Sequence, residues 1–410
     1  MKPTRLAITL LAACFTLSVN ISLMAQNWTL TGVSVYANWL SIACSSDGNK
    51  LAAVAYDDGY GDGGFVYTST NFGDLWTLAE APTNLSWQTI ASSTNGSILL
   101  LADYEDTNAN PGVLYVSTNS GKTWKAAATP SNYWNCVASS ATGSKLYAAD
   151  SGMGDGFIYA STNSGKTWTR TGAPTDFWAS ISSSADGTKL IAADSGYGDG
   201  LIYTSTNSGR SWTPTLSPVN QWTSVASSSN GMKLLASNSG YGDCLIYSST
   251  NGGLTWLPTG APSNQWASVA SSADGTQLVA ADSGYGDGLI YLSADSGSAW
   301  TSNAAVVGYW TSVTCSADGS KAAAASSPGG IYTWQSIPVL NLVPSGRKII
   351  ISWQALSSAT GFVPQNNSDL TMTNWNIMTN RPILTNGLNQ ITIPLPSSGN
   401  EFYRLVNPNP

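Results

Sequence analysis

The sequence predicts an all-β protein: a seven-bladed β-propeller of four-stranded blades, closed by an N-terminal strand and followed by a small C-terminal β-sandwich. Three observations lead to this prediction. A segment of about 44 residues recurs along the chain, as the spacing of Trp168, Trp212, Trp256 and Trp300 shows. Each copy contains four short runs rich in β-branched and aromatic residues, separated by turn residues. Four strands in a repeat of this length are typical of a propeller blade.

The composition suits such a turn-rich β protein. Charged residues make up 10% of the 410-residue chain and glycine occupies 40 positions, whereas about a quarter of the residues in an average soluble protein are charged. There is no histidine, which excludes His-based catalysis and His metal ligation. The net charge is −7, and it becomes more negative once an N-terminal segment carrying Lys2 and Arg5 is removed. We therefore expect no nucleic-acid partner.

Residues 1–25 have the features of a secretory signal peptide. Lys2 and Arg5 precede an apolar run, and small residues follow near Ala25, after which we expect cleavage. The alternative is a lipoprotein signal, because LAAC ends at Cys14, although the apolar run continues beyond that residue. Both alternatives predict a secreted or cell-surface protein. No other segment approaches the ~20 apolar residues of a membrane span.

The four strands of one copy are expected at residues 178–182, 189–194, 201–206 and 211–216. The turns between them are ADG, the loop SGYGDG, and NSGR. Every copy opens with a tryptophan in the pattern W-x-S-[IV]-A or a close variant, and six copies end with another tryptophan. The opening tryptophans are Trp39, Trp87, Trp134, Trp178, Trp222, Trp266 and Trp310.

The tryptophan that should end the seventh copy lies at the start of the mature chain. Trp28 aligns with the six ending tryptophans, whereas the copy that opens at Trp310 stops after residues 331–334. We expect residues 27–32 to supply the fourth strand of this last blade, because an open array of blades would expose unpaired edges. The propeller domain is then residues 26–335.

Residues 336–410 do not carry the repeat, and their alternating segments predict about six strands of a small β-sandwich. The segment resembles C-terminal modules of secreted bacterial proteins in three places. These are G-F-x-x-Q at 361–365, D-L-x-x-x-x-W at 369–375 and F-Y-R-L at 402–405.

The end of each copy, for example STNSGKTW at 161–168, resembles the Asp-box or BNR repeat. That superfamily includes sialidases, sortilin-type receptors, xyloglucanases and a photosystem II assembly factor. The resemblance implies a structural turn that lies away from the ligand face. The residues agree with it: Asn163 can accept bonds from turn N–H groups, Gly165 can adopt a positive φ, and Trp168 can pack between strands. The matches begin at Ser69, Ser117, Ser161, Ser205, Ser249 and Ser293.

The loop between the second and third strands is the candidate site, because propeller geometry places it beside the entry to each blade. Most copies follow the pattern D-S-G-Y-G-D-G, while the basic residues concentrate in the turns of the opposite face. The candidate ligand-binding residues are Asp57, Tyr60, Asp62, Asp150, Asp155, Asp194, Tyr197, Asp199, Tyr241, Asp243, Asp282, Tyr285 and Asp287.

Three interpretations of this acidic face remain open. The aspartates can cap N–H groups of a tight loop. Two carboxylates five residues apart, together with loop carbonyls, can instead help to hold Ca²⁺, which takes roughly six to eight oxygen ligands. Tyrosine rings and carboxylates can also bind a sugar. Ca²⁺ is the only cofactor that we consider.

The chain is expected to be a non-catalytic binding or scaffold protein. Sialidase activity is disfavoured, because that chemistry needs an arginine cluster and the propeller has only Arg170 and Arg210. The alternative is a glycoside hydrolase-like enzyme that uses loop carboxylates on a neutral polysaccharide. We expect a monomer whose partner is a glycan or another extracellular protein.

Four cysteines follow residue 25, too few for a disulfide scaffold. Cys44 and Cys315 each lie five residues after the opening tryptophan of the first and last copies, where the other copies have serine. Two alternatives stay open: a disulfide that locks the closure, or two small buried thiols.

Overall fold

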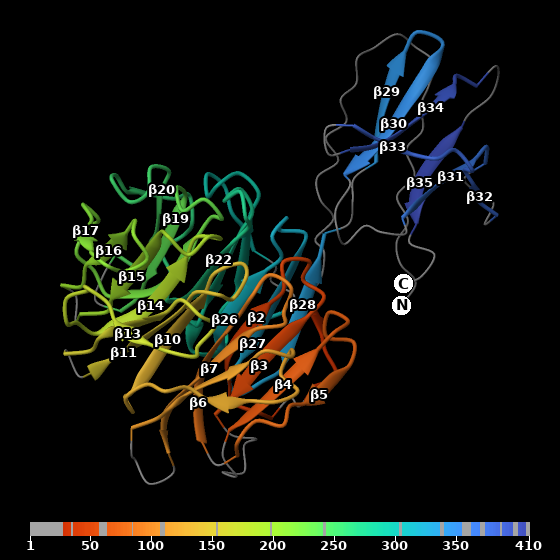
Figure 1. Cartoon of the computed structure of the whole chain (residues 1–410). Coiled ribbons are helices and arrows are strands. Elements are labelled where there is room, and N and C mark those ends of the chain that lie inside the picture. Colours follow the sequence, from red (N-terminus) through yellow and green to blue (C-terminus); the bar gives the residue numbers. More distant parts are fainter. Residues whose placement is uncertain are drawn as a thin grey trace. The chain divides into compact units, whose positions relative to one another are not determined.

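The chain folds into two compact units in a computed structural model (Figure 1). One unit spans Asn27–Gln335 and the other contains Ser336–Pro410. The structure describes residues 28–33, 36–56, 64–83, 85–106, 111–152, 155–196, 199–240, 243–302, 306–336, 340–354, 362–369, 374–385, 388–396 and 401–406.

The described part of the first unit consists of seven four-stranded antiparallel sheets, numbered here as sheets 1 to 7 in chain order. Sheet 1 contains β2 (Trp39–Cys44), β3 (Leu51–Ala55), β4 (Phe65–Ser69) and β5 (Trp76–Leu78), and sheet 2 contains β6 (Leu85–Ser92), β7 (Leu99–Asp106), β8 (Leu114–Ser117) and β9 (Lys125–Ala126). Sheet 3 contains β10 (Trp134–Ser139), β11 (Leu146–Asp150), β12 (Ile158–Ser161) and β13 (Thr169–Arg170), and sheet 4 contains β14 (Trp178–Ser183), β15 (Leu190–Asp194), β16 (Ile202–Ser205) and β17 (Thr213–Pro214). Sheet 5 contains β18 (Trp222–Ser227), β19 (Leu234–Asn238), β20 (Ile246–Ser249) and β21 (Leu257–Pro258), and sheet 6 contains β22 (Trp266–Ser271), β23 (Leu278–Asp282), β24 (Ile290–Ser293) and β25 (Thr301–Ser302). Sheet 7 contains β26 (Trp310–Cys315), β27 (Lys321–Ser326), β28 (Ile331–Gln335) and β1 (Thr29–Leu30).

The expected strand positions agree closely with the sheets, apart from the fourth strand. In sheet 4 the expected strand at 211–216 is reduced to β17, with two residues that are both exposed. The second strand is the opposite case, since all five residues of β15 are buried. Strands that are covered on both faces have continuous apolar sequences. Residues 190–193 of β15 are all apolar, and only the last residue, Asp194, is polar.

The opening tryptophan and the serine two residues later have separate structural roles. Trp178 pairs with Asp194, and a β-bulge then shifts the register so that Ser180 pairs with Ala193. The Ser180 hydroxyl accepts a hydrogen bond from the N–H of Val225, in the next sheet, at 3.0 Å. Equivalent bonds join the N–H groups of Ile90, Val269, Val313 and Ile42 to the hydroxyls of Ser41, Ser224, Ser268 and Ser312. The W-x-S pattern thus connects neighbouring sheets.

The turns between first and second strands form a cycle of backbone hydrogen bonds. Each turn donates one N–H to a carbonyl of the next turn, and the turn of sheet 7 donates to sheet 1 through Ala317 N and Ser46 O at 2.7 Å. The donor–acceptor pairs are Ser46–Thr94, Thr94–Ala141, Ala141–Ala185, Ala185–Ser229, Ser229–Ala273, Ala273–Ala317 and Ala317–Ser46. Because each turn is hydrogen-bonded to the turn of the next sheet, the turns of all seven sheets lie at the same end.

The segment around Trp28 is held in the last sheet. Thr29 pairs with Thr333 and Leu30 with Tyr332, antiparallel. Trp28 is 4% exposed and packs in an apolar cluster with Trp310 and Trp334. Strands from the two ends of the unit therefore share one sheet, and β2 packs beside β26 (Figure 1).

The second unit contains two sheets in its described part. One has the order β29 (Asn341–Ser345), β30 (Lys348–Gln354), β34 (Leu388–Pro394) and β33 (Ile383–Thr385). The other has the order β32 (Asn376–Ile377), β31 (Val363–Asn367) and β35 (Phe402–Val406). Its buried cluster includes Ile349, Ile351, Trp353, Ile391 and Tyr403. Across both units, the described residues include no helix long and apolar enough to cross a membrane.

Candidate ligand-binding face

The acidic loops lie at the end of the sheets opposite the hydrogen-bonded turns. In sheet 4 the first residue of β14, Trp178, pairs with the last residue of β15, Asp194. The loop that follows β15 and the segment that enters β14 therefore share one end of the sheet. The same pairing recurs in the other sheets, so their loops share one face, which we call the loop face.

The first acid of each loop is buried and braces the loop. Asp150, Asp194 and Asp282 are 3%, 5% and 9% exposed. Asp194 accepts a hydrogen bond from the N–H of Gly196 at 2.9 Å, and Asp282 accepts one from Gly284 at 3.1 Å. Asp150 accepts one from the N–H of Phe157 at 3.1 Å. These three carboxylates therefore hold the backbone of their loops in place.

Burial also changes the acidity of these residues. Burial raises the pKa of both Asp150 and Asp194 to about 6; hydrogen bonds from loop N–H groups oppose this shift, and neighbouring carboxylates add to it. The pKa of Asp282 is raised for the same reasons. Removing an ionised carboxylate from water disfavours its charged form, so these residues gain protons more readily than exposed aspartates.

The second acid of each loop faces solvent. Asp155, Asp199, Asp243 and Asp287 are all exposed, and they occupy equivalent positions in sheets 3 to 6. Among them, Asp243 has an extensive set of hydrogen bonds, because it accepts bonds from Asn220, Asn238 and Tyr247. Burial alone would raise the pKa of Asp243, but these hydrogen bonds together lower it.

The last glycine of the loop has no room for a side chain. A Cβ atom at Gly200 would lie 2.2 Å from the backbone oxygen of Asp194 and 2.7 Å from that of Asn220. The carbonyl of Gly200 accepts a hydrogen bond from the indole of Trp222, in the next sheet, at 3.1 Å. The final glycine and the next opening tryptophan therefore form one packing unit.

The candidate residues divide into three groups. The acids Asp150, Asp194 and Asp282 act as internal braces, and Asp155, Asp199, Asp243 and Asp287 are displayed on the loop face. The remainder lie outside the residues or side chains that the structure describes, namely Asp57, Tyr60, Asp62, Tyr197, Tyr241 and Tyr285. Within the described ranges, no group of three or more His, Cys, Asp or Glu residues could hold a metal ion.

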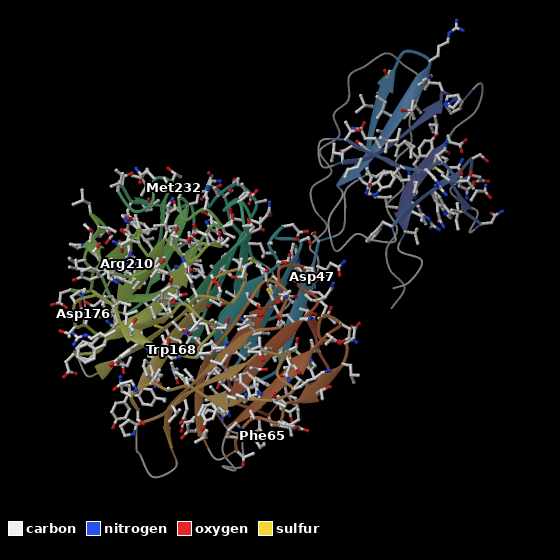
Figure 2. The ribbon with its side chains drawn as sticks, in the orientation of Figure 1. Asp47, Phe65, Trp168, Asp176, Arg210 and Met232 are labelled. Atoms are coloured by element: carbon white, nitrogen blue, oxygen red, sulfur yellow. The ribbon has the colours of Figure 1, made fainter. Side chains whose placement is uncertain are left out.

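Asp176 is a residue of the loop face that the sequence reasoning missed. This residue, labelled in Figure 2, enters sheet 4 two residues before Trp178. Its carboxyl group lies within hydrogen-bonding distance of Asp194 and of Tyr203. Sheets 3, 5 and 6 have an asparagine at this position: Asn132, Asn220 and Asn264. In sheet 3 the Asn132 amide donates to Asp150 at 3.0 Å. The replacement of asparagine by aspartate in a single copy was the available signal.

Three exposed tyrosines were missed as well. Tyr36 is 70% exposed, Tyr56 48% and Tyr309 45%. Each flanks an opening tryptophan or follows a second strand, so all three lie on the loop face. The sequence reasoning concentrated on tyrosines inside the repeated loop, whereas these three lie beside it, at positions where the residue type varies from copy to copy.

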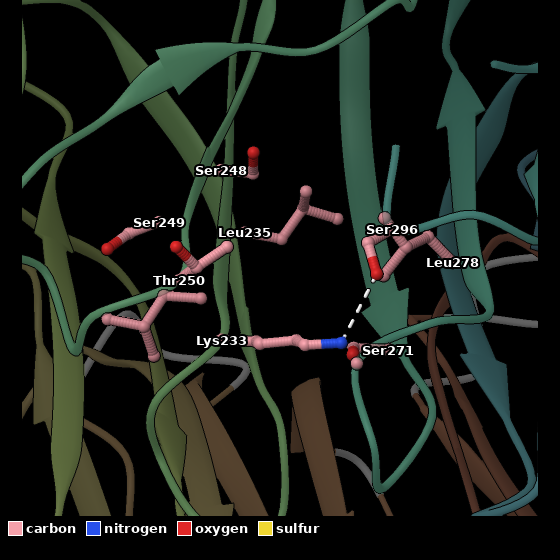
Figure 3. Close-up of a pocket in the computed structure, with 10 residues that line it drawn as sticks. Lys233, Leu235, Ser248, Ser249, Thr250, Ser271, Leu278 and Ser296 are labelled. Atoms are coloured by element: carbon pink, nitrogen blue, oxygen red, sulfur yellow. Dashed lines mark hydrogen bonds between the residues drawn. The ribbon is translucent and has the colours of Figure 1, made fainter. Parts of the chain in front are cut away.

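On the opposite face, lysine side chains connect neighbouring sheets. Lys233 donates to the hydroxyl of Ser296, in the next sheet, at 3.3 Å (Figure 3). Beside it, a cavity of about 20 Å³ is lined by Ser249, Thr250 and Ser271 among others, which is room for about one water molecule. Lys145 makes the equivalent bond to Ser208 at 3.0 Å. These contacts are structural.

The four cysteines that the structure describes, Cys44, Cys136, Cys244 and Cys315, are free thiols. Cys44 and Cys315 are nevertheless neighbours, since the Cys44 thiol donates to the backbone oxygen of Cys315 at 3.1 Å. Burial raises the pKa of Cys44 to about 11 and raises that of Cys315 further. A thiol with such a pKa is a weak nucleophile at neutral pH.

Comparison with solved structures identifies the class of fold, which is a β-propeller. YCF48 from Cyanidioschyzon merolae is 16% identical, with a TM-score of 0.56 over 75% of this chain and 98% of that one. A structure of YCF48 bound to D1 peptide is 13% identical, with a TM-score of 0.57 over 77% of this chain and 97% of that one. The GH74 xyloglucanase from Xanthomonas campestris is 16% identical, with a TM-score of 0.56 over 80% of this chain but 59% of its own length.

No protein-family profile and no curated protein matches the sequence. At these levels of identity the solved structures establish a shared fold and no shared activity.

Proposed function

We propose that the protein is a non-catalytic binding propeller that acts outside the cytoplasm and recognises its ligand on the loop face. In this proposal residues 1–25 are a signal peptide and the seven sheets are the blades of a ring that β1 closes. The turns at the opposite end are Asp-box turns, and residues 336–410 form a β-sandwich module. The cycle of turn hydrogen bonds and the pairing of β1 with β28 support the ring.

The observation that carries the non-catalytic function is the use of the buried acids. Asp150, Asp194 and Asp282 accept hydrogen bonds from the backbone of their own loops, so each of these acids is engaged in holding its loop. A glycoside hydrolase needs two carboxyl groups about 5 Å or more apart across the scissile bond. Asp176 and Asp194 are close enough to hydrogen bond to each other, which leaves no room for a sugar between them.

The solved neighbours are compatible with either a binding protein or an enzyme. One neighbour is described as bound to D1 peptide and another as a xyloglucanase. Glycoside hydrolysis of a neutral polysaccharide is the alternative function, favoured by the pKa of about 6 at Asp194, which suits a general acid. The same pKa is explained by burial without any catalytic role.

The test uses the mature protein, residues 26–410, in two assays. Retention on a glycan array or on immobilised extracellular proteins, with no reducing sugar released from neutral polysaccharides, supports the proposal. Release of sugar that Asp194→Asn abolishes supports the hydrolase. A protein that neither binds nor hydrolyses in these assays contradicts both functions.

The location is tested separately with the full-length chain. N-terminal sequencing of exported protein is expected to begin at Gln26. A protein that carries lipid on Cys14 indicates the lipoprotein alternative, and an uncleaved cytoplasmic chain contradicts export.

A further inference from the structure

We propose that exposed leucines of sheet 5, and of the segment that leads into it, bind the surface of an anionic lipid bilayer. The contact, which we call the leucine patch, consists of Leu216, Leu254 and Leu257 together with Met232 and the ammonium group of Lys189. The inference goes beyond the proposed function, because it concerns the end of the sheets opposite the loop face and a lipid partner.

The leucines are displayed although the tryptophan between two of them is buried. Leu216, Leu254 and Leu257 are 85%, 70% and 69% exposed, whereas Trp256 is 8% exposed. A leucine in water forgoes the free energy that its burial would contribute. A group of exposed leucines on one surface therefore indicates contact with an apolar partner.

These leucines occur at positions where the repeat otherwise has charged, polar or small residues. None of the five other copies that end in a tryptophan has a leucine at any of the three positions. The equivalents of Leu216 are Glu80, Ala128, Gly172, Gly260 and Ala304, those of Leu254 are Asp74, Lys122, Lys166, Arg210 and Ser298, and those of Leu257 are Thr77, Lys125, Thr169, Thr213 and Thr301. The three departures from the repeat all belong to one part of the first unit.

Leu216 and Leu254 come from neighbouring sheets and lie beside the same turn. A Cβ atom at Gly253, in the turn between β20 and β21, would lie 3.1 Å from Cγ2 of Thr215. Thr215 directly precedes Leu216, and Gly253 directly precedes Leu254. Leu257 begins β21, the strand that leaves this turn. The three leucines therefore lie around one turn of sheet 5.

Met232 and Lys189 join the leucine patch from the adjacent turn. The N–H of Gly252 donates to the carbonyl of Met232 at 2.8 Å, and a Cβ atom at Gly252 would lie 3.7 Å from Met232 Sδ. Nζ of Lys189 donates to the carbonyl of Asn230 at 2.9 Å and to Met232 Sδ at 3.1 Å. A positive charge thus lies directly beside the apolar side chains.

This lysine differs from a counterpart in the residue that it meets. In sheet 6 the turn between the first and second strands contributes Asp274, which interacts electrostatically with Lys233 of the preceding sheet. Sheet 5 has Asn230 at the position of Asp274. The turn that receives Lys189 therefore offers an amide in place of a carboxylate, and its positive charge stays available to an anion.

The other charges near the leucine patch also favour an anionic partner. Residues 200–260 contain a single acid, Asp243, which belongs to the loop face, and Arg210 adds a positive charge in the turn before β17. In sheet 4, Asp186 interacts electrostatically with Lys145 of sheet 3. Anionic lipid headgroups attract basic side chains that lie within a Debye length, about 10 Å, of the surface. A negatively charged lipid surface fits this local charge.

The edge of β21 disfavours a peptide strand as the partner. The N–H of Thr259 donates to the carbonyl of Ile246 at 2.8 Å, so the backbone nitrogen of Pro258 lies on the outer edge of the sheet. Proline has no N–H with which to bond an added strand. Insertion of leucines into a bilayer needs no such bond, and its strength rises with the apolar area buried and the attraction to anionic lipids.

The test is co-sedimentation of the mature protein, residues 26–410, with vesicles of phosphatidylglycerol and phosphatidylethanolamine or of phosphatidylcholine alone. We expect binding to the anionic vesicles to be at least about tenfold tighter than to the neutral ones. Leu254→Ser/Leu257→Ser should weaken it about twentyfold or more, and Leu216→Ser about fivefold, because each removes apolar area from the contact. Arg210→Gln should weaken binding to the anionic vesicles alone, by about fivefold.

The matched control is Leu75→Ser/Leu78→Ser in sheet 1. These leucines are 68% and 51% exposed and lie on either side of Trp76. Their neighbours along the chain include the acids Asp74 and Glu80, which an anionic surface repels. The control should therefore bind vesicles as the wild type does. All the substituted residues are exposed, so each variant should keep the melting temperature of the wild type.

The outcomes that overturn the leucine patch are distinct from those that test the loop face. Equal binding to both kinds of vesicle, binding to neither, binding that survives the leucine variants, or an equal loss in the sheet 1 control each overturns the lipid partner. A dimer in lipid-free solution that Leu254→Ser/Leu257→Ser converts to a monomer also overturns it, because the leucines then form an interface between two copies. The proposed function is tested by other assays, and it stands or fails independently of these results.

Discussion

Asp176 shows how one residue changes a repeated structure. The copies in sheets 3, 5 and 6 place an asparagine where sheet 4 places this aspartate. In sheet 3 the asparagine amide donates to the buried acid, whereas in sheet 4 two carboxyl groups meet. Two carboxylates at this distance repel each other when both are ionised, so sheet 4 favours the protonated form of Asp194.

Asp176→Asn is therefore expected to stabilise the protein at neutral pH. Because the folded pKa of Asp194 is about 6, above its value in the unfolded chain, the folded state binds a proton more tightly. The contribution of Asp194 to stability is then greatest below about pH 4 and falls as the pH rises through 6. The variant should reduce this fall by on the order of 1 kcal/mol, measured by urea unfolding between pH 4 and pH 8.

The effect should be partial, since burial persists in the variant, as it does at Asp150 beside Asn132. The reverse substitution Asn132→Asp is the matched control, because it creates the same pair in sheet 3 and should deepen the fall. Identical pH profiles for the wild type and Asp176→Asn would show that the pair carries no stability cost.

At the scale of the element, the described ends of the loop between second and third strands are fixed by local contacts. An internal carboxylate accepts loop N–H groups at one end, and a glycine packed against backbone closes the other. The opening tryptophan of the next sheet donates its indole N–H to the carbonyl of this glycine, so the loop and the first strand of the next sheet stabilise each other.

Gly200→Ala is expected to destabilise the protein by at least about 2 kcal/mol. The added methyl group would lie 2.2 Å from a backbone oxygen, which a side-chain rotation cannot relieve. Gly32→Ala serves as the control, because nothing lies within 4 Å of its Cβ position, and it should change stability by less than about 0.5 kcal/mol. Urea unfolding measures both, and equal losses would refute the packing role of Gly200.

At the scale of the whole molecule, the segment around Trp28 joins the two ends of the first unit. Trp28→Ala is expected to cost about 3–5 kcal/mol, as for other buried aromatic residues. Leu30→Ala, at a residue 45% exposed in the same strand, should cost far less. Deletion of residues 27–32 should lower the melting temperature more than either variant. A deletion that melts like the wild type would exclude β1 from the closure.

The two units should also unfold independently. Truncation after Gln335 removes the second unit along the boundary between the compact regions. We expect the calorimetric transition of the remaining unit to keep its temperature, with the smaller transition lost. A large shift of the main transition would indicate that the units stabilise each other.

Much of this architecture could be predicted because the sequence of each strand recurs several times along the chain. The spacing of the opening tryptophans located the first strand of each sheet. The turn around Asn163 is also as expected, since the Asn163 side chain accepts a hydrogen bond from the Thr167 N–H at 2.9 Å. The contact between Asp176 and Asp194 was not predictable from spacing, because it depends on how a blade is entered. The exposed tyrosines were missed for a related reason, since each occurs at a position where the residue type varies from copy to copy.

The pairing of β1 with β28 has a mechanical consequence. The two strands are antiparallel, with Thr29 opposite Thr333 and Leu30 opposite Tyr332, so the chain before Trp28 and the chain after Gln335 leave the sheet at the same end. A force that pulls these two chain segments apart loads the backbone bonds of this pair one after another instead of all together. We expect a modest tension applied across these two chain segments to separate β1 from β28 before the other strands of the first unit part.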